Sequence, residues 1–166
     1  MTVEFTQRAI THLTENLPRI EKCLNQLSEE EVWQRPNSSS NSVGNLLLHL
    51  CGNVGQYILS SLAGRPDVRE RDAEFAAKGG LDKAALMDLV QMTVKNACEV
   101  IGSQDRNSLL TVRSVQGFQM SGIAIVMHVV EHFSYHVGQI AFWTKQLRDQ
   151  DLGFYEGINL NQKNEA

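Results

Sequence analysis

Apolar residues recur at steps of three and four through most of this sequence, and that spacing limits the folds available to the chain. Residues three or four positions apart lie on one face of an α-helix, so the pattern forms an apolar stripe that must be buried. Pro18 interrupts the first striped segment, where we expect a kink or a restart. The segments are residues 3–27, 43–63, 83–101 and 122–148. Four such helices predict an all-α chain folded as a four-helix bundle.

Polar residues at the segment boundaries support these limits. Ser28 and Glu31 have capping-box spacing, which predicts a short helix through Trp33 that ends before Pro36. A capping side chain satisfies backbone N–H groups that the first helical turn leaves free. The candidate caps of the later helices are Asn41 or Ser42, Asp82 and Ser121.

Two long connections separate the helices. Residues 67–80 are charged and show no apolar period, while residues 103–120 include a weakly alternating stretch, 109–115, that favours a short extended piece. Connections of this length suit crossovers better than tight hairpins, and loops on a rigid scaffold often carry substrate contacts. We expect one domain over residues 1–166, with 149–166 as a C-terminal tail.

The composition excludes several classes of partner. The formal net charge is −4, which offers no general attraction to nucleic acid. No apolar run approaches the roughly 20 residues that span a membrane, and residues 1–7 lack the pattern of a signal peptide. The cysteines are scattered singly and are expected to be reduced core thiols, which indicates a cytoplasmic protein. They are Cys23, Cys51 and Cys98.

Three of the five histidines lie on the fourth predicted helix at intervals of four residues. His132 and His136 therefore lie one turn apart on one face, an arrangement that can hold a metal ion. His128 is roughly 12 Å from His136 along the helix axis, too far for all three to share one ion easily. His49, set among leucines of the second helix, is a candidate third ligand. From pattern alone, a metal site and a set of ordinary core or surface histidines explain these residues about equally well.

Two motifs resemble the signatures of DinB-like proteins. Residues 132–139, HFSYHVGQ, resemble the H-x-x-x-H-x-G-Q motif on the last helix of that family. Residues 41–50, NSVGNLLLHL, resemble its second-helix motif. The resemblance extends from the first helix to about Leu147, and the stretch Arg69–Phe75 resembles an uncharacterised branch of the family.

This resemblance implies a DinB-like bundle with up-down-down-up topology, which often forms homodimers. It implies a divalent-metal site, for zinc or nickel, with ligands His49, His132 and His136. Some DinB-like proteins are metal-dependent S-transferases that use glutathione, mycothiol or bacillithiol, whereas others have a metal site and no assigned reaction. A small-molecule thiol and an electrophilic substrate are therefore the implied partners.

Six further polar residues are predicted close to the metal or to a substrate. Four follow from helical spacing relative to the histidines, and each has the alternative of a satisfied core residue or a bridge between helices. Two are arginines, which match carboxylates or instead pair with nearby acids and fix the loop. The four are His128, Gln139, Asn53 and Gln56, and the arginines are Arg69 and Arg71.

Three glycines, Gly52, Gly55 and Gly138, lie inside two of the predicted helices. Glycine weakens a helix interior. These positions therefore indicate either the close approach of another segment or open space beside the site, and the sequence does not choose between the two.

A three-histidine site with an open position is typical of catalytic metal sites. A metal in such a site lowers the pKa of a bound water or thiol. S-transferases and hydrolases share these ligands, so the ligands do not separate them. The sequence favours a metal-dependent thiol S-transferase, with a non-catalytic metal-binding or stress-associated protein, or a metal hydrolase, as the alternatives.

Overall fold

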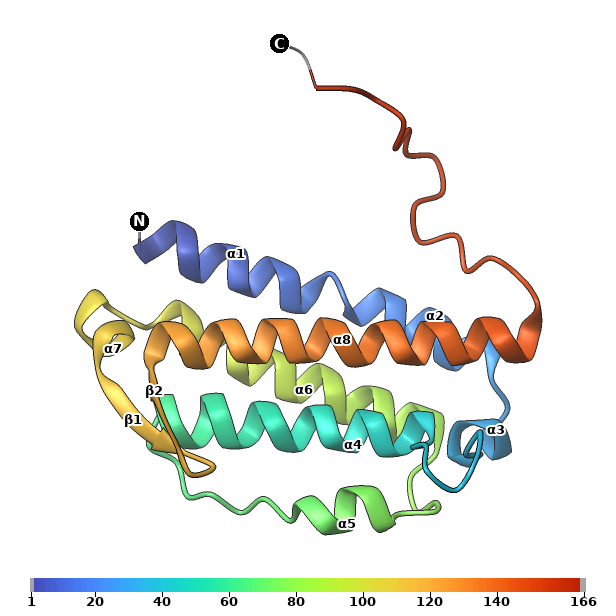
Figure 1. Ribbon diagram of the computed structural model, residues 1–166, viewed down its shortest axis with the longest axis horizontal. Helices are drawn as coiled ribbons and strands as arrows, with labels where there is room; N and C mark the ends of the chain where they lie inside the picture. The colour runs from blue at the N-terminus through green and yellow to red at the C-terminus, as the bar shows by residue number, and fades with distance from the viewer. Residues whose placement is uncertain (1, 165–166) are drawn as a thin grey trace.

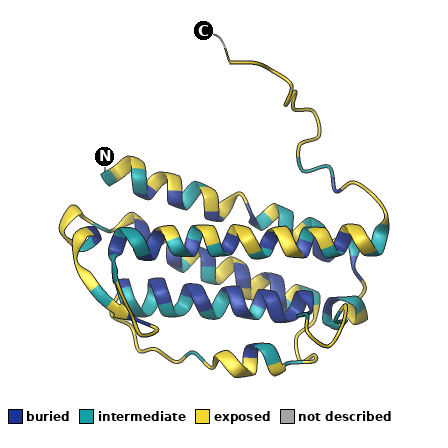
Figure 2. Cartoon of the chain, viewed as in Figure 1, coloured by how far each residue is buried: buried dark blue, intermediate teal, exposed yellow. Residues whose placement is uncertain are grey.

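Four long helical rods form the bundle in the computed structural model, which describes residues 2–164 (Figure 1). Residue 1, and residues 165–166 of the predicted tail, lie outside the described residues. Apolar side chains from all four rods meet in one core, and the exposed residues face outward (Figure 2). The rods are α1 (Thr2–Thr14) with α2 (Leu17–Gln26), α4 (Val43–Val54) with η1 (Gly55–Leu62), α6 (Lys83–Gly102), and α8 (Gly122–Arg148).

The rods run up, down, down and up (Figure 1). α1, α2 and α8 point one way, whereas α4 and α6 point the other. Two consecutive parallel rods need a connection that returns along the length of the first. The structure therefore confirms the predicted all-α four-helix bundle with up-down-down-up topology. None of the helices in the described part of the chain has the length and apolar character to cross a membrane.

The return connection between the parallel rods lies along the outside of α4 and carries a short helix, α5 (Arg71–Ala76). The sequence predicted a charged connection over residues 67–80 and did not indicate this helix. Apolar periodicity could not reveal α5, because Glu74 is the one residue of this helix that is buried. Polar contacts hold it against the bundle instead.

The second connection contains α7 (Arg106–Leu110) and an antiparallel hairpin of β1 (Val112–Val115) and β2 (Phe118–Ser121). The predicted extended piece is present, but it begins at Val112 and pairs with a second strand that was not predicted. Gln116 and Gly117 turn the hairpin with φ values of 50° and 82°. Two consecutive positive φ values match the twist of a two-residue hairpin loop.

The capping residues act as predicted at four helix starts. Ser28 and Glu31 form both bonds of a capping box at α3 (Glu29–Trp33), while Ser42, rather than Asn41, caps α4. The first rod restarts at α2 with a proline in its first turn, as expected for Pro18. The other two predicted caps are Asp82 at the start of α6 and Ser121 at the start of α8. The side chain of each accepts a hydrogen bond from a backbone N–H of its helix.

The second rod continues to Leu62 as predicted, but its latter part, η1, is π-helical. A π-helix bonds residue i to residue i+5 and so has a wider turn. Tyr57 and Leu62 are five positions apart and both are buried. The wider turn thus keeps both side chains directed into the core.

A buried asparagine joins the start of α4 to α5. Asn45 Oδ1 accepts bonds from the backbone N–H and the hydroxyl of Ser42, at 3.2 and 2.8 Å. Its Nδ2 donates to the carbonyl oxygens of Glu74 and Ala77, at 2.9 and 2.8 Å. Asn45 is fully buried, so if its side chain were removed, solvent could not easily reach the partners of these four hydrogen bonds.

We expect Asn45→Ala to lower the free energy of unfolding by about 2–4 kcal/mol, because it leaves buried carbonyls unpaired and weakens a helix cap. Urea unfolding followed by circular dichroism measures the change. Asn25→Ala, at an exposed position of α2, is the control and should change the free energy by less than about 0.5 kcal/mol. A similarly small effect of Asn45→Ala would contradict the assigned role.

Candidate metal centre

Three histidines from two rods converge inside the bundle. His49 lies on α4, and His132 and His136 lie one turn apart on α8. The Nε2 atom of His132 is 3.1 Å from Nε2 of His49 and 3.2 Å from Nε2 of His136. One ligand nitrogen from each residue lies within 4.8 Å of the other two. The structure thus brings together the three histidines that the sequence singled out, which we call the histidine triad.

The hydrogen bonds of the triad leave nitrogen lone pairs facing one another. Glu74 Oε2 lies 2.9 Å from His49 Nδ1, and Gln139 Oε1 lies 2.7 Å from His136 Nδ1. Both oxygens accept, so each Nδ1 carries the proton and each Nε2 presents a lone pair. The Nε2 atom of His132 can donate a proton to only one of these two lone pairs. A cation between the three nitrogens would satisfy all of them.

The donor set and its spacing fit a divalent metal ion. Nitrogen ligands bound tetrahedrally at about 2.0–2.1 Å lie roughly 3.3 Å apart. The two separations that involve His132, 3.1 and 3.2 Å, are close to this value, and the nitrogens of His49 and His136 lie within 4.8 Å of each other. Neutral imidazoles suit zinc and nickel among the divalent ions. The triad therefore has the donor atoms and the proximity to hold a metal ion.

Burial favours the neutral form of the two triad histidines on α8. The pKa of His132 is lowered to about 3 by burial and by the neighbouring imidazoles of His136 and His49. Burial also lowers the pKa of His136, and outweighs the opposing bond from Gln139. Both rings are therefore uncharged at neutral pH, so a metal ion would not have to compete with the charged imidazolium form of either ring.

An ion pair orients His49 from outside the triad. Arg69 donates to both oxygens of Glu74, from Nε at 2.8 Å and from a terminal nitrogen at 2.9 Å. Burial raises the pKa of Glu74, but the bonds from Arg69 and His49 outweigh it and hold the pKa below its usual value. Glu74 is thus a carboxylate that fixes the tautomer of His49, as carboxylates commonly do for metal-binding histidines.

Glu74 was missed as a site residue by sequence reasoning. Its side chain approaches α4 at Gly52, where a Cβ atom would lie 1.9 Å from Glu74 Oε1. The signals in the sequence were a glycine inside a helix and the family-like stretch Arg69–Phe75. Gly52 therefore marks a close approach, whereas added Cβ atoms at Gly55 and Gly138 would meet nothing within 4 Å.

The two arginines have different surroundings. Arg69 pairs with Glu74 and also donates to Gln56 at 3.0 Å, so the alternative that it fixes the loop is the one observed. Arg71 instead lies over the ring of Phe75, with 4.8 Å from guanidinium to centroid. The Phe75 ring in turn packs against His49, with 4.7 Å between centroids.

The remaining candidates lie beside the triad rather than in it. His128 stacks on Tyr57 at 4.4 Å, and its Nε2 lies 3.4 Å from Asn53 Nδ2. Burial lowers the pKa of His128. Gln56 donates to Asp67 at 2.8 Å and so helps to hold the loop before α5. His128 thus lies outside the triad, but its ring stacks on that of His132 with 5.4 Å between centroids.

A cavity of about 410 Å³ opens beside the triad. His49 and His132 line it directly, and Arg71 lies at its wall. The hairpin contributes Gln116 and Phe118 to the lining. A small molecule in this cavity would contact two of the three triad residues.

Solved structures of bacterial proteins share this architecture. The DinB-like protein YjoA of Bacillus subtilis gives a TM-score of 0.67 at 14% identity, over 89% of this chain and 97% of its own. A conserved protein of Enterococcus faecalis gives 0.72 at 17% identity, over 87% and 98%. A DinB-like protein of Bacillus cereus gives 0.65 at 17% identity, over 84% and 91%. The fold is thus that of the DinB-like helical bundles.

The sequence also matches one family model over most of its length. Residues 1–157 match DUF1572, which is described as a protein of unknown function. The chain belongs to this DUF1572 family, in agreement with the predicted DinB-like relationship. No match was found among curated proteins.

We expect Glu74→Gln to weaken zinc binding by about 10- to 100-fold, because removing a carboxylate that orients a metal-binding histidine has effects of this size. Competition with a chromophoric chelator measures the affinity. Glu70→Gln changes the same charge at an exposed position of the same segment and should bind zinc like the wild type. Equal affinities for the two variants would show that Glu74 does not support the site.

Proposed function

We propose that this protein binds zinc or nickel through His49, His132 and His136 and catalyses transfer of a small-molecule thiol to an electrophilic substrate. The observation that carries this proposal is the histidine triad with a cavity against two of its members. A metal site whose coordination positions are all filled by protein ligands is typical of structural sites, whereas a site that opens to a cavity leaves a position for a reactant.

The metal would lower the pKa of a thiol or water in the site, and so supply a nucleophile at neutral pH. The chain's own residues would then hold the geometry. Glu74 fixes the ring of His49, and Gln139 fixes the ring of His136. Rings held in this way keep their Nε2 lone pairs directed at one point throughout the reaction.

The cavity beside the triad suits the charged end of a thiol cosubstrate. Arg71 lines this cavity and is exposed, whereas the charge of Arg69 is taken by Glu74. A guanidinium binds a carboxylate with two parallel hydrogen bonds. Glutathione, mycothiol and bacillithiol differ in structure, and Arg71 would favour those that carry a carboxylate.

The overall reaction balances without a further reactant. The sulfur of the thiol forms a bond to the electrophilic carbon, the bond from that carbon to its leaving group breaks, and the thiol proton passes to solvent. The triad contains no acidic side chain. The chemistry proposed here therefore depends on the metal and the thiol rather than on a general base among the ligands.

Metal content provides the first test. We expect near-stoichiometric zinc or nickel in untagged protein by elemental mass spectrometry, and a loss of at least about tenfold in His49→Ala, His132→Ala and His136→Ala, because each removes one ligand. The control is His12→Ala, since His12 lies on α1 outside the triad. Full metal retention by all three triad variants would exclude the site.

Cobalt substitution tests the thiol. We expect glutathione, mycothiol or bacillithiol to produce a new near-ultraviolet absorption band in the cobalt-loaded protein, because sulfur that engages the metal changes its spectrum. Arg71→Ala should weaken the response to a carboxylate-bearing thiol by about tenfold but leave the response to 2-mercaptoethanol unchanged. Metal binding without any thiol response, together with turnover of an activated ester, would instead indicate a hydrolase. Metal binding with neither response would indicate a non-catalytic protein.

A further inference from the structure

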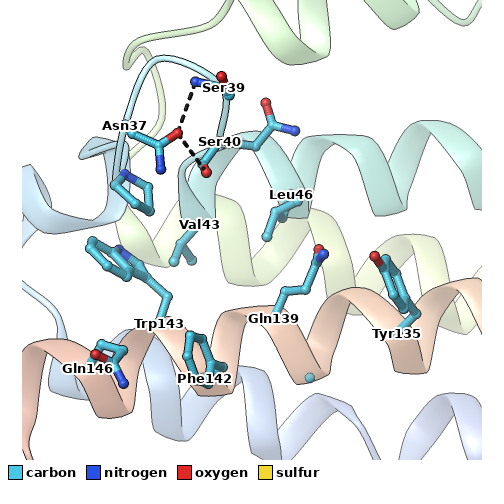
Figure 3. Close-up of a pocket in the computed structure, with 13 residues that line it drawn as sticks. Asn37, Ser39, Ser40, Val43, Leu46, Tyr135, Gln139, Phe142, Trp143 and Gln146 are labelled. Atoms are coloured by element: carbon cyan, nitrogen blue, oxygen red, sulfur yellow. Dashed lines mark hydrogen bonds between the residues drawn. The ribbon is translucent and has the colours of Figure 1, made fainter.

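A second cavity, of about 660 Å³, lies between α8 and the loop that precedes α4 (Figure 3). Trp143 lies on α8 beside this loop, Phe142 is next to it, Tyr135 lies farther along the same helix, and Leu46 faces α8 from α4 (Figure 3). The loop is braced by Asn37, whose Oδ1 accepts bonds from the backbone of Ser39 and the hydroxyl of Ser40, both at 3.0 Å. We call this cavity the aromatic pocket.

The lining of the aromatic pocket contains no carboxylate, lysine, arginine or histidine. Its polar side-chain groups are amides, hydroxyls and the indole N–H of Trp143. Tyr135 and Phe142 are 62% and 65% exposed, so two aromatic rings present their surface to solvent here. A charged ligand would lose hydration in such a pocket without gaining a partner, whereas a flat uncharged ring would stack on these side chains. The chemistry of the walls therefore favours an uncharged aromatic molecule.

The aromatic pocket adjoins the histidine triad through two of its wall residues. Gln139 lines the pocket and bonds to His136 at 2.7 Å. The ring of Tyr135 lies 5.1 Å from that of His136. The cavity with Arg71 contacts His49 and His132 instead. The triad is thus flanked by a polar, cationic cavity and by a neutral aromatic one.

We propose that the aromatic pocket binds the uncharged aromatic part of the electrophilic substrate, separately from the cavity that takes the thiol. This assignment of the substrate rests on the proposed thiol transfer, but binding of an aromatic molecule does not. A two-substrate reaction needs two sites of different chemistry near one reactive centre. One cavity is lined by His49 and His132, and the aromatic pocket reaches His136 through Gln139 and Tyr135.

Gly138 allows the pocket to be blocked without damage to the helix. It lines the pocket on α8, and a Cβ atom there would meet nothing within 4 Å. Gly138→Leu would fill the pocket with apolar bulk and raise helix propensity. The control is Ser134→Leu, which places the same bulk one turn earlier on α8 at an exposed position outside the pocket.

The probe is N-phenyl-1-naphthylamine, an uncharged aromatic molecule whose fluorescence increases in apolar surroundings. We expect saturable binding to the full-length protein, a Kd raised by about tenfold or more in Gly138→Leu, and a Kd within about twofold of wild type in Ser134→Leu. Phe142→Ala removes a wall ring instead of adding bulk and should also weaken binding. If the melting temperature of Gly138→Leu is lower than that of the wild type, Phe142→Ala still provides an independent test of the pocket.

Equal binding by wild type, Gly138→Leu and Phe142→Ala would overturn the proposal. A second result would also overturn it: the wild type binds no probe and is a dimer in sedimentation velocity, whereas Gly138→Leu is a monomer. In that case a second copy of the chain would cover the pocket. Saturable, pocket-dependent probe binding in a protein that shows no thiol response would support the aromatic site and reject only the transfer reaction.

Discussion

The buried ion pair between Arg69 and Glu74 fixes the geometry on which the site depends. Two charges taken out of water are costly unless each has a partner and further hydrogen bonds. Here the carboxylate also bonds to His49, and the guanidinium also bonds to Gln56. The charges are thus satisfied only when the crossover segment lies against α4, and Gly52 leaves the space for that approach. A contact between a loop and a helix, rather than packing within the bundle, sets the orientation of the first histidine.

Much of the fold could be predicted because it depends on local pattern. Apolar periodicity indicated the four rods, and capping residues such as Ser28 and Ser42 indicated where helices begin. The short helix α5 could not be predicted in this way, since it buries no apolar side chain, and the partner strand of the hairpin depends on a turn with unusual backbone angles. The π-helical form of η1 changes the hydrogen-bond spacing without changing which stretch is helical.

The site was predictable where helical spacing alone decides the outcome. His132 and His136 share a face because four residues exceed one turn by only about 40°, while two such steps carry His128 away from His136. His128 accordingly stacks on Tyr57. The role of Glu74 depends on a contact across 25 positions of sequence, which local pattern does not report. The DinB-like neighbours, at 14–17% identity, establish the fold, and the chemistry has to be argued from this chain's own side chains.

The polar docking of α5 links local folding to metal occupancy. A segment held by a few hydrogen bonds and one ion pair, with little apolar burial, opens at a much lower free-energy cost than the core helices. Opening would withdraw Glu74 from His49 and loosen one ligand. By thermodynamic linkage, if the closed segment raises the affinity for the metal ion by a given factor, the bound ion raises the equilibrium constant for closing by the same factor. Protection of residues 69–77 from hydrogen exchange would then follow metal concentration while the four rods stay folded, so that this segment would report the state of the site.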